Sequence, residues 1–95
     1  MAKAILYENS NYSGYSVQVT LDIPDFTKIH FNDRLTSAKV ESGTFTLYEH
    51  VNFGGSSVTI CSTGGPSSDG NYPSSAFLGG RNDFYSSIRR NSDKP

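Results

Sequence analysis

An internal repeat is the feature of this sequence that most constrains its fold. Residues 7–14 (YENSNYSG) align with residues 48–55 (YEHVNFGG), at an offset of 48 − 7 = 41. A second pair of blocks, 32–37 (NDRLTS) and 82–87 (NDFYSS), follows at an offset of 82 − 32 = 50. Two blocks that recur in the same order indicate a duplicated unit of about 40 residues. The extra residues of the second copy are expected between 62 and 77.

The hydrophobic patterning predicts strands rather than helices. Apolar and polar residues alternate over short runs, and clusters of Gly, Asn, Ser and Pro separate these runs as turns. The runs predict strands at 4–7, 16–20, 37–40, 44–49, 57–61 and 87–89. This spacing is typical of an all-β sandwich or barrel with seven or eight short strands. At 95 residues the chain is expected to form one domain over residues 1–95, with repeat 1 at about 3–42 and repeat 2 at about 44–90.

The composition excludes several classes of partner. A formal net charge of -1 gives no electrostatic reason to bind nucleic acid or an anionic membrane, and no apolar run approaches the ~20 residues of a spanning helix. The N-terminal residues lack the apolar stretch of a secretory signal, which fits a cytosolic chain or a secreted mature form, so localisation is unknown. One Cys cannot form an internal disulfide. Because a chain this short buries only about 60–65% of its unfolded surface, a metal is a candidate for additional stabilisation.

The first repeated block has the composition of a folded hairpin. In each copy two aromatic residues flank a polar tetrapeptide, and a Gly follows two positions later. The rings can cover the sheet, and the Gly can adopt backbone angles that a Cβ forbids. We therefore assign a structural role to Tyr7, Tyr12, Gly14, Tyr48, Phe53 and Gly55.

The second repeated block gathers oxygen ligands. The pattern Asn-Asp-x-x-Ser/Thr-Ser offers a carboxylate, an amide oxygen, hydroxyls and loop carbonyls, and neither copy contains Cys or His. Such ligands disfavour a soft transition metal and suit Ca²⁺, which takes about 6–8 oxygens. One loop supplies too few, whereas two loops placed against each other supply enough. The alternative is that each Asn-Asp pair only forms an Asx-turn, but two copies beside the same hairpin block favour the metal.

Together the two blocks resemble the βγ-crystallin domain family in its microbial calcium-binding form. The family's hairpin pattern is aromatic, four residues, aromatic, one residue, Gly, and its calcium motif is Asn/Asp-Asn/Asp-x-x-Ser/Thr-Ser. Both copies match both patterns, and the resemblance covers about residues 3–90. It implies two intercalated four-stranded Greek key motifs that form a β-sandwich. Many members carry Trp in the core, and since this chain has none, the volume is expected to be filled by Phe26, Phe31, Phe45 and Phe77.

The resemblance also implies two Ca²⁺ ions in a double clamp that both repeats share. One ion would be held by the carbonyls of Glu8 and Arg34, the hydroxyl of Thr36 and the side chain of Asp83. The other would be held by the carbonyls of Glu49 and Phe84, the hydroxyl of Ser86 and the side chain of Asp33. Ser37 and Ser87 would hydrogen-bond across the folded hairpins, while direct ligation by Asn32 and Asn82 is left open. With one carboxylate per ion, we expect an affinity of roughly 10⁻⁶ to 10⁻³ M.

A non-enzymatic calcium-binding domain is the expected function, and no catalytic residue is assigned. The Gly-x-Ser-x-Gly motif is absent, and His30 and His50 lie in no catalytic pattern. Cys61 ends an alternating run and is expected to be a buried structural thiol. Two alternatives stay open: a protein or glycan interaction module that calcium shapes, and an enzyme or protease inhibitor that uses the 62–75 loop. The expected state is a monomer whose partner is calcium, without nucleic acid or membrane.

Overall fold

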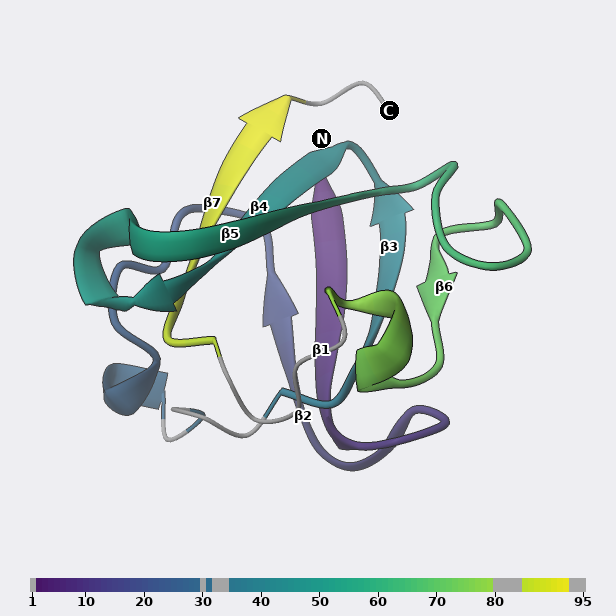
Figure 1. The fold of residues 1–95 in the computed structure, drawn as a ribbon, viewed down its shortest axis with the longest axis horizontal. Coiled ribbons are helices and arrows are strands. Elements are labelled where there is room, and N and C mark those ends of the chain that lie inside the picture. The colour runs from purple at the N-terminus through teal and green to yellow at the C-terminus, as the bar shows by residue number, and fades with distance from the viewer. Residues whose placement is uncertain (1, 30, 32–34, 80–84, 93–95) are drawn as a thin grey trace.

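The computed structural model describes residues 2–29, 31, 35–79 and 85–92. In that part of the chain it contains seven strands and three short 3₁₀ helices (Figure 1). In chain order they are β1 (Lys3–Asn9), β2 (Ser13–Val19), η1 (Phe26–Ile29), β3 (Ser37–Ser42), β4 (Thr44–His50), η2 (Val51–Phe53), β5 (Gly54–Cys61), β6 (Asn71–Tyr72), η3 (Ser75–Phe77) and β7 (Ser87–Ser92). Every strand predicted from alternation is confirmed, and β6 is additional. Among the described residues, no helix has the length and apolar character needed to cross a membrane.

The strands form two antiparallel sheets that face each other. The first has the order β2-β1-β3-β6 and the second the order β5-β4-β7. β1 and β4 hold equivalent places, each between its hairpin partner and the last strand of its own repeat. Both hairpins also carry a register shift at the same place, between Tyr7 and Asn9 and between Tyr48 and His50. The predicted all-β fold of Greek key type agrees with this arrangement.

A segment of each repeat pairs with the last strand of the other repeat. β6, from the second repeat, pairs with β3 of the first, where Tyr72 lies opposite Ala38. Conversely, Ile23 of the first repeat forms a bridge with Ile88 in β7. The two contacts are equivalent, because Ala38 and Ile88 differ by 88 − 38 = 50, the offset of the second repeated block. The two repeats are therefore intercalated.

Most of the additional residues of the second repeat lie in the loop 62–70, between β5 and β6. Val19 aligns with Ile60 at the offset of 41, whereas Ile23 and Tyr72, which hold equivalent places, differ by 72 − 23 = 49. Eight of the nine extra residues (49 − 41 of 50 − 41) therefore precede β6. The extra residues, predicted to lie between 62 and 77, are therefore mostly in the first part of that interval.

The loop 62–70 is compact. The Gly70 N–H donates to the Gly64 carbonyl at 3.0 Å, which closes the loop on itself, and the Gly70 carbonyl accepts the Val40 N–H at 2.7 Å. Gly70 has a φ of +83°, and a Cβ there would lie 2.2 Å from the Val40 carbonyl oxygen. Glycine is thus required at the point where the loop meets β3.

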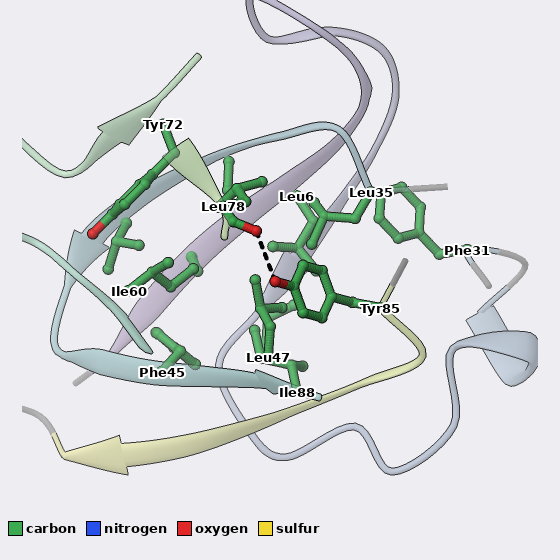
Figure 2. Packing of buried hydrophobic residues seen from close by; sticks show 14 of the residues in the cluster. Leu6, Phe31, Leu35, Phe45, Leu47, Ile60, Tyr72, Leu78, Tyr85 and Ile88 are labelled. Carbon is green, nitrogen blue, oxygen red and sulfur yellow. Dashed lines mark hydrogen bonds between the residues drawn. The ribbon is translucent and has the colours of Figure 1, made fainter. Parts of the chain in front are cut away.

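Side chains from both repeats form one apolar cluster between the sheets (Figure 2). The buried members are Ala2, Ala4, Leu6, Val19, Phe26, Phe31, Leu35, Ala38, Val40, Phe45, Leu47, Ile60, Tyr72, Leu78, Tyr85 and Ile88. The prediction that Phe26, Phe31 and Phe45 fill the core is confirmed, since all three are completely buried. The prediction for Phe77 is wrong, because its side chain in η3 is 45% exposed.

Two tyrosines and a leucine of the second repeat are buried where Phe77 was expected. Tyr72, Leu78 and Tyr85 are at most 5% exposed. The Tyr85 hydroxyl donates to the Leu78 carbonyl at 2.7 Å, as Figure 2 shows. A buried tyrosine needs such a partner, because an unpaired hydroxyl in an apolar core costs stability.

Cys61 also differs from its prediction, since it is only partly buried. Its backbone N–H donates to the Tyr72 hydroxyl at 3.0 Å, and its sulfur lies 3.6 Å from the Thr63 hydroxyl. Burial raises the pKa of Tyr72 above its ordinary value. Tyr72 thereby ties the end of β5 to β6.

Candidate metal centre

The first hairpin folds over its own sheet and is held there by Ser37. Asn11 and Tyr12 at the hairpin tip have positive φ values of 57° and 61°. The Tyr12 ring packs edge-on against the Tyr7 ring, with the centroids 5.7 Å apart. The buried Ser37 donates its hydroxyl to the Asn9 carbonyl at 2.5 Å and accepts the Tyr12 N–H at 3.1 Å. Ser37 therefore fastens the start of β3 to the hairpin.

The second hairpin repeats this geometry. The rings of Tyr48 and Phe53 are again 5.7 Å apart at an interplanar angle of 68°, the same values as in the first hairpin. Ser87 donates its hydroxyl to the His50 carbonyl at 2.6 Å and accepts the Phe53 N–H at 3.2 Å. The cross-hairpin hydrogen bonds expected of both serines are thus present in both repeats.

A glycine stands just past the tip of each hairpin, where the backbone is left-handed. Gly14 and Gly55 have φ values of +80° and +78°. A Cβ would lie 2.6 Å from Nδ2 of Asn9 in the first hairpin and 2.7 Å from Cδ2 of His50 in the second. The left-handed backbone accounts for the glycine of the repeated pattern, because the atoms that a Cβ would meet belong to the ends of side chains that can move.

A basic side chain covers the aromatic ring at each hairpin tip. The Lys39 ammonium lies 4.6 Å from the centroid of Tyr12, and the Arg89 guanidinium lies 4.6 Å from that of Phe53. Burial, and then the nearby charge of Asp69, raise the pKa of Tyr12. Sequence reasoning missed these cation–π contacts, although the offset 89 − 39 = 50 places the two basic residues in register.

Each hairpin is also bonded to the hydroxyl-bearing residue of the second block. The Thr36 N–H donates to the Tyr7 carbonyl at 3.0 Å, and the Ser86 N–H donates to the Tyr48 carbonyl at 2.8 Å. Thr36 and Ser86 therefore lie beside the residues that follow these tyrosines in the chain, which are Glu8 and Glu49. Two residues of each predicted calcium site are thus brought together.

The other predicted ligands lie outside the described residues: Asp33, Arg34, Asp83 and Phe84. Asn32 and Asn82 lie outside them as well. Buried residues stand on both sides of these segments, with Phe31 and Leu35 flanking the first and Leu78 and Tyr85 flanking the second. In the described part of the chain, no three Asp, Glu, His or Cys side chains are close enough to hold a metal.

The described ligands have the chemistry of a hard-cation site. Thr36 and Ser86 contribute hydroxyl oxygens, and Ser86 is only 8% exposed. The Nε2 of His50 lies 3.7 Å from the carboxylate oxygen of Glu49. Oxygen ligands on a rigid framework fit Ca²⁺ better than Zn²⁺ or copper.

Comparison with known proteins identifies the family. The family model Beta/Gamma crystallin matches residues 3–91. The chain belongs to the beta/gamma-crystallin family. The beta/gamma-crystallin of Ciona intestinalis is 30% identical over 90 residues, which is 95% of this chain and 99% of that protein. A solved structure of a beta gamma crystallin from Ciona intestinalis has a TM-score of 0.83 at 29% identity, over 94% of this chain and 99% of that one.

Other beta/gamma-crystallins come from distant organisms. A betagamma-crystallin structure from an archaeon has a TM-score of 0.81 at 33% identity, covering 95% of this chain and 98% of that one. Beta-crystallin B2 of Aquarana catesbeiana is 27% identical over 89 residues, but the match spans only 40% of its length. Membership of the family therefore fixes the fold without separating microbial from animal members.

Proposed function

We propose that this beta/gamma-crystallin domain is non-enzymatic and binds two Ca²⁺ ions, each shared between the repeats. The observation that carries the proposal is the repeated bond from the second block to the hairpin, Thr36 to Tyr7 and Ser86 to Tyr48. In each repeat this bond sets a hydroxyl beside the hairpin residue whose carbonyl is a candidate ligand. Two sites with matching chemistry follow from one duplicated unit.

The ligands are assigned across the repeats. Glu8, Arg34 and Thr36 hold the first ion together with Asp83, and Glu49, Phe84 and Ser86 hold the second together with Asp33. Bound Ca²⁺ would supply a cross-link between the two halves of the chain. A ligand that binds only the native state stabilises it by about 2.7 kcal/mol at 100-fold excess over Kd, which corresponds to a rise in melting temperature of roughly 10 °C or more for a domain of this size.

We also assign the domain to the microbial calcium-binding type. The support is that both copies of the Asn-Asp-x-x-Ser/Thr-Ser motif are complete. Structures similar to this chain include betagamma-crystallins from an archaeon and from Flavobacterium johnsoniae, the latter with a TM-score of 0.73 at 26% identity over 97% of both chains. The assignment depends on calcium binding, because the Ciona intestinalis protein is about as similar.

Calorimetric titration of the metal-stripped protein tests the proposal. We expect two bound ions in the wild type and one full-strength site in each of Asp33→Ala and Asp83→Ala. Asp69→Asn is the matched control, because its carboxylate lies outside both motifs and bonds Asn71. Two full-strength sites in both alanine variants would refute the crossed assignment. An unchanged melting temperature in millimolar calcium would refute calcium binding itself.

A further inference from the structure

Each hairpin tip is bonded to the other repeat. The Asn11 N–H donates to the Pro73 carbonyl at 2.8 Å, and the Asn52 N–H donates to the Pro24 carbonyl at 2.7 Å. The two bonds are equivalent, because the asparagines differ by 52 − 11 = 41 and the prolines by 73 − 24 = 49, the offsets of the matching parts of the repeats. Each repeat therefore presents the same kind of contact surface to the other.

The contact between the repeats is also the hydrophobic core. The buried cluster contains side chains from both repeats, such as Leu6 and Phe26 of the first and Phe45 and Ile88 of the second. A main-chain bond from the Phe26 N–H to the Ser86 carbonyl, at 2.8 Å, crosses the same contact. Such an interface resembles a core cut in half. A repeat that leaves its partner exposes apolar surface, which another copy of that partner can cover.

One residue, Gly43, connects the two repeats. β3 ends at Ser42 and β4 begins at Thr44, and the two strands belong to different sheets. Figure 1 shows the chain passing from β3 directly into β4 at the end of the molecule where β1 begins. Residues 2–42 and 44–92 are therefore two units joined at a single position.

The conformation of Gly43 is unfavourable for any residue with a Cβ. Its φ is +82°, and a Cβ would lie 2.5 Å from the Cβ of Ala2 and 2.6 Å from the Ser92 carbonyl oxygen. The Ser92 oxygen belongs to the main chain of β7, where Ser92 is paired with Thr44, so it cannot move aside as a side chain would. The Gly43 carbonyl accepts the Ser62 N–H at 3.1 Å. Glycine thus permits the closed turn, and a side chain opposes it.

We infer that the surface between the repeats is also an interface between two copies of this chain, which exchange whole repeats with Gly43 as the hinge. In this dimer the hinge is extended, residues 2–42 of each copy pack against residues 44–92 of the other, and every contact between the repeats is kept. A second copy is the partner that fits, because it carries the same contacts at the same positions, and reciprocal exchange closes a two-fold assembly. The inference does not depend on calcium binding.

The hinge sets the chain concentration at which exchange competes with closure. A short linker holds two units at an effective concentration in the millimolar range, so we expect a monomer at micromolar concentration and a growing dimer population towards about 1 mM. In Gly43→Val the left-handed turn lowers the population of the closed chain by about 10-fold, whereas an extended hinge suits a β-branched residue. Because one dimer opens two turns, its dissociation constant should fall by about 10 × 10 = 100-fold.

A designed cysteine pair distinguishes exchange from every other form of dimer. Lys39 in β3 and Asn71 in β6 lie opposite each other, although they belong to different repeats. Opposite residues of antiparallel strands have Cα atoms about 4.5–5.5 Å apart, which is within the range for a disulfide. In the triple variant Lys39→Cys/Asn71→Cys/Cys61→Ser, the closed monomer forms this disulfide within one chain, and the exchanged dimer forms it between two chains.

The experiment is refolding at graded chain concentration, without calcium. The triple variant is unfolded in urea with reductant, refolded between about 1 μM and 1 mM, oxidised and analysed on a non-reducing gel. We expect a covalent dimer whose fraction rises with concentration. Addition of Gly43→Val should give the same fraction at about 100-fold lower concentration. Gly55→Val is the matched control, because Gly55 has a φ of +78° but lies within one repeat, and it should leave the concentration dependence unchanged.

The protein with the native hinge decides the test where Gly43→Val does not fold. Disulfides confined to single chains up to about 1 mM would overturn the exchange. An equal gain of covalent dimer in Gly55→Val and Gly43→Val would overturn the role of Gly43 as the hinge, and a ladder of larger covalent species would overturn the reciprocal assembly of two chains. An absence of calcium binding by calorimetry would overturn the proposed function and leave this inference intact.

Discussion

Ile23 and Ile88 exchange two backbone hydrogen bonds, of 2.8 and 3.0 Å, although Ile23 belongs to the first repeat and Ile88 to the second. Beside this pair, the Asp22 carboxylate accepts the Arg90 N–H at 2.7 Å, so one segment of the first repeat covers the outer edge of β7. In the other sheet, the Val40 N–H meets the Gly70 carbonyl at the equivalent place. The last strand of each repeat therefore forms backbone hydrogen bonds with a segment of the other repeat, and neither repeat can form all of these bonds alone.

Removal of the Ile23 N–H should therefore destabilise both sheets together. In Ile23→Pro the buried carbonyl of Ile88 loses its partner, and we expect a loss of about 1–3 kcal/mol in the free energy of unfolding. Amide exchange at Leu6 in the first sheet and Leu47 in the second should accelerate by the same factor. Leu21→Ala, at a side chain 62% exposed, should stay within about 0.5 kcal/mol of the wild type. Faster amide exchange at only one of the two residues Leu6 and Leu47 would contradict the prediction that the two sheets unfold together.

The buried hydroxyls of Ser37 and Ser87 should contribute substantially to the stability of the fold. Ser37→Ala leaves the Asn9 carbonyl and the Tyr12 N–H without their partner, and we expect it to cost about 1–3 kcal/mol of stability in urea unfolding. Ser87→Ala should cost a similar amount, because its two bonds are equivalent. The control is Ser13→Ala, whose exposed hydroxyl bonds only the Ser10 carbonyl and should change stability by less than about 0.5 kcal/mol. Equal effects at Ser13 and Ser37 would show that the cross-hairpin bonds contribute little.

The strands could be predicted from the sequence because alternation records which face of a sheet is buried. β6 could not be predicted, since Asn71 and Tyr72 carry no periodic pattern and their strand exists only through pairing with β3. The expectation that Phe77 lies in the core rests on the core volume that Trp fills in many members of the family and that this chain must fill with other aromatic side chains. The 3₁₀ helix that carries Phe77 turns it outward, and hydrophobicity does not distinguish it from the buried Tyr85.

The candidate site also has features that the sequence predicts and features that only the structure shows. Its oxygen chemistry is visible in the sequence, because the Asn-Asp motif and its repeat are side-chain patterns. The bond from Phe26 to Ser86 joins two main-chain groups 86 − 26 = 60 positions apart and leaves no pattern in the residue types. Contacts of that kind depend on the intercalation of the repeats and are found only in three dimensions.

The carboxylate of Asp25 predicts a pH dependence of stability. A hydrogen bond from the Thr27 hydroxyl at 2.6 Å, and a second from the Thr27 N–H at 2.9 Å, hold the pKa of Asp25 below its ordinary value of 3.8. A lowered pKa stabilises the fold above the ordinary value, and this contribution is lost as the pH falls through the lower, native value. The wild type should therefore exceed Asp25→Asn in melting temperature at pH 6, and the difference should shrink as the pH falls below about 4.

Thr27→Val is the matched control for this titration. It removes the hydroxyl bond to Asp25 and keeps the backbone bond, so its melting temperature should show a pH dependence between those of the wild type and Asp25→Asn. Equal differences between wild type and Asp25→Asn at pH 3 and pH 6 would exclude the proposed role of the carboxylate.

The loop 62–70 should be dispensable for folding and for calcium binding. Ser62 and Gly70 lie close together at the two ends of the loop, since an ideal Cβ built on Gly70 would lie 3.2 Å from the Cα of Ser62. Consecutive Cα atoms in a chain are about 3.8 Å apart. Ser62 can therefore be joined directly to Gly70 when residues 63–69 are deleted. The bond from Val40 to the Gly70 carbonyl is kept. We expect a change in stability within about 1 kcal/mol and an unchanged number of bound calcium ions by calorimetry.

The same deletion tests whether this loop acts as the bait of an inhibitor. A segment that fills a protease cleft is extended, whereas this loop is closed by the bond between Gly64 and Gly70 and contains turn residues with positive φ, such as Ser68 at 56°. Replacement of residues 63–69 by a Gly-Ser linker of equal length is the control, because it keeps the loop length and removes its side chains. The loop meets β3 through the bond between Val40 and Gly70, and the charge of Asp69 lies near Tyr12 in the first hairpin. A loss of bound calcium in the deletion alone would therefore mean that loop length, transmitted through β3 or the first hairpin, sets the geometry of Thr36.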